Sequence, residues 1–135
     1  MLLPKVFTMA HFEEHCRDCE RLLGDRAEHV NRWMDELFRK FGPLHRFARH
    51  HWRGVDEAGK QWGTLGRKAA IVHILKDCGW VPAARDWAEQ RVDTLGFKVN
   101  RPYGTDPTAE LVSVFNGYWD PKEFTVAAQK LLDEE

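Results

Sequence analysis

Apolar residues at three- and four-residue spacing are the feature that most restricts the fold of this chain. The pattern is clearest over residues 27–41, where charged residues cover the opposite side and the apolar stripe consists of Val30, Trp33, Met34, Leu37 and Phe41. Spacing of this kind places side chains on one face of an α-helix, which is then buried against a neighbouring element. Because strand signals are weak elsewhere, the sequence predicts an all-α fold.

Five helices are expected before residue 97. They span about residues 9–23, 27–41, 43–55, 67–78 and 82–96, with the glycine-rich stretch 54–66 as a loop. Two shorter helices are expected to begin at Asp106-Pro107 and Asp120-Pro121, because Asp followed by Pro is typical of helix N-termini. We therefore expect a compact bundle of about five helices over residues 1–96. Residues 97–135 would form a smaller C-terminal helical extension packed on it, within one domain.

Composition and charge exclude several classes of protein. The formal net charge of -1 gives the molecule no general attraction to nucleic acid or membrane surfaces. No apolar run reaches the length of a transmembrane helix, so no membrane partner is expected. The three cysteines fit a reducing cytoplasm better than a disulfide framework, and the spacing of Cys16 and Cys19 favours core packing on a helix. A cytoplasmic protein is expected.

Residues 43–55 hold the densest set of chemically capable side chains. These are the histidines and arginines His45, Arg46, Arg49, His50, His51 and Arg53. Read as one helix, the segment places His51 within the apolar stripe, His50 at one margin, and His45 and Arg49 at the other. A basic, imidazole-rich helix with a histidine aimed at the core predicts a functional site.

Two pairs at i, i+4 spacing suggest ligands for a metal ion. Each pair lies one helical turn apart, so that both of its side chains can reach one ion. The pairs are His11 with His15 and His73 with Asp77, and His51 would lie between them. These five ligands suit zinc, iron or manganese. Since a helical wheel places His73 opposite Ile71 and Ile74, it meets the others only if its helix is covered on both sides.

A metal site beside a basic patch predicts chemistry on a phosphate-containing ligand. Arg46 and Arg49 would hold the anion by charge-assisted hydrogen bonds. The ion would lower the pKa of a bound water, and His45 or His50 would transfer protons. The ligand would be a small molecule or a nucleic acid, because Trp52 and Trp62 can stack on bases. The first hypothesis is therefore that the protein is a metal-dependent hydrolase. The sequence alone does not decide whether it is an enzyme.

The alternative hypothesis is a non-catalytic interaction module. His15 and His51 would then be buried neutral histidines, hydrogen-bonded to each other, to Asp35 or to the backbone. The histidines would form a structural polar network, and the basic face would pair with acidic residues. The module would bind a host protein through the acidic segment 97–135, with its exposed aromatic residues Tyr103, Tyr118 and Trp119.

Four short motifs in the sequence resemble those of a known protein family. They are Met-Ala-His with a second histidine four residues on (9–15), Trp-x-Asp (33–35), His-Arg-x-x-Arg-His-His-x-x-Gly-aliphatic (45–55) and His-aliphatic-x-x-Asp-x-Gly-x-aliphatic-Pro-x-x-x-Asp-Trp (73–87). Together they resemble a family of small bacterial and phage proteins classed as a domain of unknown function. The resemblance covers about residues 9–87. It indicates which residues matter to such a family and brings no reaction with it. The alternative interaction module would be encoded by a phage or another mobile element.

Overall fold

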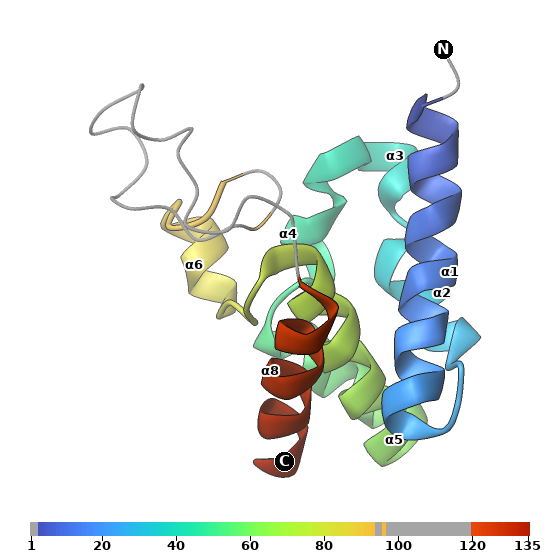
Figure 1. Cartoon of the computed structure of the whole chain (residues 1–135). Helices are drawn as coiled ribbons and strands as arrows, with labels where there is room; N and C mark the ends of the chain where they lie inside the picture. The colour runs from blue at the N-terminus through green and yellow to red at the C-terminus, as the bar shows by residue number, and fades with distance from the viewer. Residues whose placement is uncertain (1–2, 94–95, 97–119) are drawn as a thin grey trace.

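Helices are the regular elements of this protein (Figure 1). The computed structural model describes residues 3–93, 96 and 120–135, without the side chains of residues 3–11 and 43. The helices are α1 (Leu3–Leu23), α2 (Glu28–Asp35), α3 (Phe38–Phe41), the 3-10 turn η1 (Gly42–His45), α4 (Arg46–Arg49), α5 (Trp52–Cys78), α6 (Ala84–Ala88) and α8 (Pro121–Asp133). The predicted all-α fold is confirmed.

The long helix α5 is the element around which the others pack. It contacts α1 and α2 on one side and α4 and α8 on others, as Figure 1 shows. Every residue from 69 to 75 is buried, and the core around them includes Val30 and Met34 of α2 and Phe124 and Leu132 of α8. This part of α5 is therefore covered on all sides, which is the condition for His73 to point into the interior.

The predicted loop over residues 54–66 is wrong, because α5 runs through it with one bend. The backbone leaves helical geometry at Gly63, which has φ 73° and ψ −155°. Glycine adopts such a positive φ without steric cost. The bend divides α5 into a first arm, 52–62, and a second arm, 64–78, which fold towards each other: Arg67 pairs with Asp56, and Gly66 lies against the backbone of Ala58.

The prediction of one helix over residues 43–55 is also wrong. α4 ends at Arg49; His50, the next residue, has the non-helical angles φ −87° and ψ 64°, and His51 is extended before α5 begins. The His51 ring caps α5: its Nδ1 accepts a hydrogen bond from the Gly54 N–H, and its Nε2 donates to the Phe47 carbonyl. The break exchanges the expected roles of the two histidines, so that His50 reaches the interior while His51 bonds to nearby backbone.

Other helix boundaries lie closer to the predicted ones. α2 ends at Asp35, and the following turn directs Phe41 outwards, where it is 48% exposed, instead of along the core-facing stripe. The helix expected over residues 82–96 is the short α6, and α1 begins earlier than expected, at Leu3. No helix of the described ranges has the length and apolarity needed to cross a membrane.

Several predicted helix ends are confirmed. Gly24 and Gly79 follow their helices with φ of 79° and 80°. The Asp120 carboxylate accepts hydrogen bonds from the N–H groups of Lys122 and Glu123 and so caps α8. The helix expected at Asp106-Pro107 and the aromatic residues Tyr103, Tyr118 and Trp119 lie outside the described residues.

Gly54 gives a test of the close packing between α4 and α5. A Cβ at this position would lie 1.9 Å from the Arg49 carbonyl oxygen, and neither backbone can move without opening the junction. We predict that Gly54→Ala lowers the free energy of unfolding by about 3 kcal/mol, measured by urea denaturation.

The matched control is Gly59→Ala in the same helix. Its Cβ would meet the Arg67 Cβ at 3.4 Å, an ordinary contact. Because alanine favours a helix over glycine by about 1 kcal/mol, this variant should equal or exceed the wild type in stability. A Gly54→Ala protein as stable as Gly59→Ala would contradict the packing described here.

Candidate metal centre

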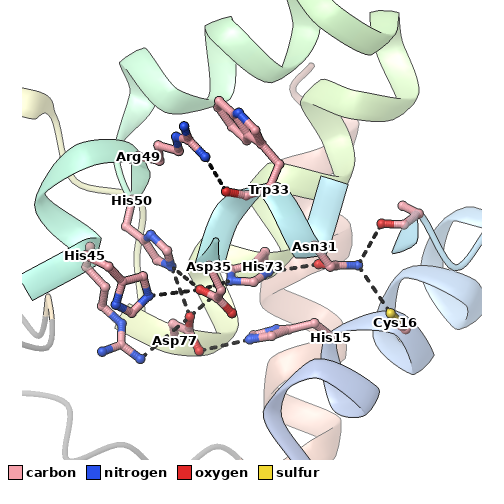
Figure 2. A network of polar contacts seen from close by, with 12 residues as sticks. His15, Cys16, Asn31, Trp33, Asp35, His45, Arg49, His50, His73 and Asp77 are labelled. Carbon is pink, nitrogen blue, oxygen red and sulfur yellow. Dashed lines mark hydrogen bonds and ion pairs between the residues drawn. The ribbon is translucent and has the colours of Figure 1, made fainter. Parts of the chain in front are cut away.

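Histidine and aspartate side chains from several helices meet in the interior between α1, α2, α4 and α5 (Figure 2). We call them the His/Asp cluster, which consists of His15, Asp35, His45, His50, His73 and Asp77. Its imidazoles are at most 3% exposed. Residues 62 positions apart in the sequence, such as His15 and Asp77, are brought within hydrogen-bond distance.

The Asp35 carboxylate is the meeting point of three imidazoles. Its Oδ1 lies 3.0 Å from Nε2 of His45, 3.2 Å from Nε2 of His73 and 3.6 Å from Nε2 of His50. Asp35 is the last residue of α2, and its side chain keeps 32% exposure. The cluster therefore has one side that solvent reaches.

The Asp77 carboxylate lies deeper and has a similar set of neighbours. Its Oδ1 is 3.1 Å from His15 Nε2, and its Oδ2 is 3.1 Å from His50 Nε2 and 3.3 Å from His73 Nε2. The Asp77 side chain is 6% exposed, and Nη2 of Arg46 lies 3.8 Å from Oδ2. His50 and His73 thus contact both carboxylates.

Hydrogen bonds at the far nitrogen orient two of the rings. Nδ1 of His73 donates to Asn31 Oδ1 at 2.8 Å, and Nδ1 of His45 donates to the Gly42 carbonyl at 2.7 Å. Asn31 is fixed in turn, because its Nδ2 donates to the carbonyls of Arg26 and Ala27. In the neutral form each ring then presents the Nε2 lone pair to a carboxylate oxygen. A proton or a metal ion must lie between such acceptors, and an anchored Nδ1–H is typical of metal-bound histidine.

Burial and charge shift the pKa values of the cluster in opposite directions. Burial lowers the pKa of His50 to about 3. At His73 burial also acts downwards, but the charges and hydrogen bonds of Asp35 and Asp77 outweigh it and raise the pKa to about 9. Although burial favours the protonated acids, the imidazoles hold the pKa of Asp35 and of Asp77 well below the usual range. Without metal, therefore, His73 carries a proton between two carboxylates.

The structure brings some of the predicted metal ligands together and separates others. His15 and His73 stack with ring centroids 3.7 Å apart, and Asp77 lies beside both. His51 is not part of the cluster, because both of its nitrogens bond to backbone groups. The side chain of His11 lies outside the described part of α1. The cluster also contains Asp35, His45 and His50, which were not among the predicted metal ligands.

Arg46 and Arg49, the predicted anion-binding pair, have different surroundings. Arg46 is buried beside Asp77, and its Nε has no hydrogen-bond partner among the described residues. Arg49 donates to the Trp33 carbonyl and to Glu36, and its guanidinium stacks over the Trp33 ring at 4.2 Å. Arg49 therefore holds α4 against α2 and, unlike Arg46, does not line the pocket beside the cluster, so its role in binding an anion stays a prediction.

A pocket of about 570 Å³ opens beside the cluster. Asp35 and His45 line it, and so do the basic residues Arg32, Arg39 and Arg46 and the acidic residue Glu36. Phe12 and Phe38 add an apolar wall. Trp52 and Trp62, the tryptophans considered for base stacking, are not among its lining residues; Trp62 packs on Trp33 with ring centroids 5.6 Å apart. The pocket therefore offers an anionic ligand access to Asp35 and His45.

Sequence reasoning gave Asn31 and Arg32 no role at this site. Asn31 and Arg32 lie four and three residues before Asp35, about one turn away on the same helix α2. The signal that could have found them is this polar edge of an otherwise amphipathic helix.

The pKa shifts predict how the stability of the metal-free protein depends on pH. The unfolded-state pKa of histidine is about 6.5. As the pH rises from 6.5 to about 9, the stabilisation from the His73 proton is lost. As the pH falls below 6.5, the unfolded chain takes up a proton at His50 that the buried neutral ring does not, so the folded state loses stability. Protonation of Asp35 and Asp77 in the unfolded chain adds to this loss near pH 4. Urea denaturation in the presence of chelator should therefore give a maximum near pH 6.5. Asp35→Asn should reduce the loss on the alkaline side, and identical alkaline slopes in both proteins would contradict this electrostatic account.

Comparisons of the chain with protein-family models, with curated proteins and with solved structures gave no match. The motif resemblance to the bacterial and phage family therefore stays a prediction. What the protein does is argued from the geometry of the cluster and the pocket.

Proposed function

We propose that the protein binds a divalent metal ion at the His/Asp cluster and uses it to hydrolyse a phosphate-containing ligand. The observation that carries the proposal is the orientation of the buried rings. Nε2 atoms from four histidines face two carboxylates, while oxygen acceptors anchor Nδ1 of His45 and His73. This arrangement matches the way in which outer hydrogen bonds orient metal-bound histidines.

The distances within the cluster fit a metal coordination sphere. His15, Asp35, His73 and Asp77 each offer a ligand atom, and these atoms lie within 4.8 Å of one another. Ligands held 2.0–2.1 Å from a tetrahedral zinc ion are about 3.3 Å apart. The contacts of Nε2 of His73 with the two carboxylates, at 3.2 and 3.3 Å, are of that size. Two imidazoles and two carboxylates suit zinc, iron or manganese.

The basic pocket supports an anionic substrate. Arg46 reaches from the cluster into the pocket, and Arg32 and Arg39 add positive charge around it. A metal ion with an open coordination position lowers the pKa of a bound water towards neutrality. The hydroxide oxygen would attack phosphorus, the P–O ester bond would break, and the leaving alcohol would take up a proton. Water in the pocket would supply that proton, because both ring nitrogens of His45 are committed to Asp35 and to the Gly42 carbonyl.

Metal content tests the first half of the proposal. Protein purified without added metal should hold about one or more ions per chain by elemental analysis, and a chelator should lower its melting temperature. Asp77→Asn keeps the size of the side chain but removes a buried ligand charge, so we expect less than about a tenth of the wild-type metal content. His29→Gln is the matched control, since His29 is exposed and outside the cluster, and it should keep the wild-type content.

A wild-type protein that contains no metal, takes up none on addition and melts unchanged with chelator would contradict the proposal. The cluster would then be a proton-filled network that stabilises the fold, as the stacked rings of His15 and His73 also permit. The interaction-module hypothesis would be the one to pursue.

Hydrolysis of p-nitrophenyl phosphate and of bis(p-nitrophenyl) phosphate tests the second half. Arg46→Gln should lower kcat/KM by about tenfold to a hundredfold, because a hydrogen bond between a guanidinium and an anion is worth about 1.5–3 kcal/mol. Arg53→Gln is the control arginine, since Arg53 is exposed and is not among the residues that line the pocket, and its kcat/KM should stay near wild type. Metal-loaded protein inactive on both substrates would leave a metal-binding protein without this activity.

A further inference from the structure

The His/Asp cluster contains more ligands than one ion with an open position needs. The ligand atoms fall into two groups, His15–Asp35–His73–Asp77 and Asp35–His45–His50, and each group lies within 4.8 Å. Asp35 belongs to both groups. We propose that the cluster holds two divalent ions that share Asp35: an inner ion bound by the first group and an outer ion bound by the second. This inference rests on the proposed function.

The inner group has the features of a closed site. It supplies four ligands, and the rings of His15 and His73 are 1% and 0% exposed. Asp77, the second carboxylate, is 6% exposed. A full set of four protein ligands is typical of metal sites that stabilise a fold. The inner ion would tie α1, α2 and α5 together.

The outer group has the features of an open site. It supplies three ligands, and two of them, Asp35 and His45, line the pocket. Three protein ligands with a remaining position for water are typical of catalytic metal sites. Nε2 of His45 faces Asp35 Oδ1 at 3.0 Å with its Nδ1–H committed to the Gly42 carbonyl, so a cation is required between them. The inner ion does not supply this cation, because His45 is not one of its four ligands.

The charge of such a centre restricts its substrate. Two divalent ions and the Arg46 guanidinium, against the carboxylates of Asp35 and Asp77, leave a net positive charge of three in a largely buried site. An uncompensated buried charge is costly. A metal-bound hydroxide and the dianion of a phosphate monoester would neutralise it. Pairs of ions that share a bridging ligand also stabilise both the attacking and the leaving oxygen in phosphate ester hydrolysis.

Manganese titration of the chelator-treated full chain tests this inference. We expect two Mn²⁺ per chain by native mass spectrometry and elemental analysis, and an electron paramagnetic resonance spectrum with exchange coupling between the ions. His45→Gln removes an outer ligand and should leave one ion per chain with the spectrum of isolated Mn²⁺. His50→Gln should do the same by an independent substitution, while His29→Gln should keep both ions.

The outcomes separate this inference from the proposed function. One tightly bound, magnetically isolated Mn²⁺ in the wild type would overturn the two-ion centre and leave the proposed metal site intact. No bound Mn²⁺, with Zn²⁺ and Fe²⁺ equally excluded by the same titration, would overturn both. If a variant does not fold, the wild-type stoichiometry and spectrum still decide between one ion and two.

Discussion

Two carboxylates inside a helical core are the constraint on which the rest of the structure depends. A buried charge must be compensated by opposite charge and hydrogen bonds, because its desolvation is expensive. Asp35 and Asp77 draw their partners from different elements: His15 from α1, His45 and His50 from the η1–α4 segment, and His73 from α5. The cluster therefore fixes how these elements meet, whichever cations fill it. The proposed function would thus use the same side chains that hold the helices together.

Long-range hydrogen bonds hold open the helix break that admits His50 to the cluster. The Trp87 indole N–H donates to the His50 carbonyl at 2.9 Å, and the Trp52 N–H donates to the Pro82 carbonyl at 2.9 Å. Both bonds use backbone groups near the break, which would otherwise be left unsatisfied. The segment around α6 is thus part of the support for the site. This gives a physical reason for Pro82 and Trp87 to accompany the histidines in the sequence.

These bonds also explain which features the sequence could predict. The all-α fold, the helix stops at Gly24 and Gly79, and the cap at Asp120 follow from local rules and are confirmed. The pairing of His73 with Asp77 also follows from local spacing. The break after His50 could not be read locally, because it depends on Trp87 and Pro82, and a regular wheel therefore chose His51. The prediction of a loop over residues 54–66 is wrong for a similar reason. The glycine content suggests a loop, but packing between the two arms of α5 makes them helical on either side of the bend at Gly63.

Arg46 shows how one set of residues can serve two electrostatic states of the proposed centre. Without metal, the carboxylates are balanced by the protonated His73 and by Arg46, whose Nη2 is 3.8 Å from Asp77 Oδ2. Metal ions in the proposed centre would displace the His73 proton and neutralise Asp77, because metal ligands must be deprotonated. The Arg46 guanidinium would then compensate less negative charge within the cluster, and its positive charge would be available to an anion in the pocket that it lines. Metal loading would in this way prepare the pocket for phosphate, which links the inner ion to substrate binding without any movement of the helices.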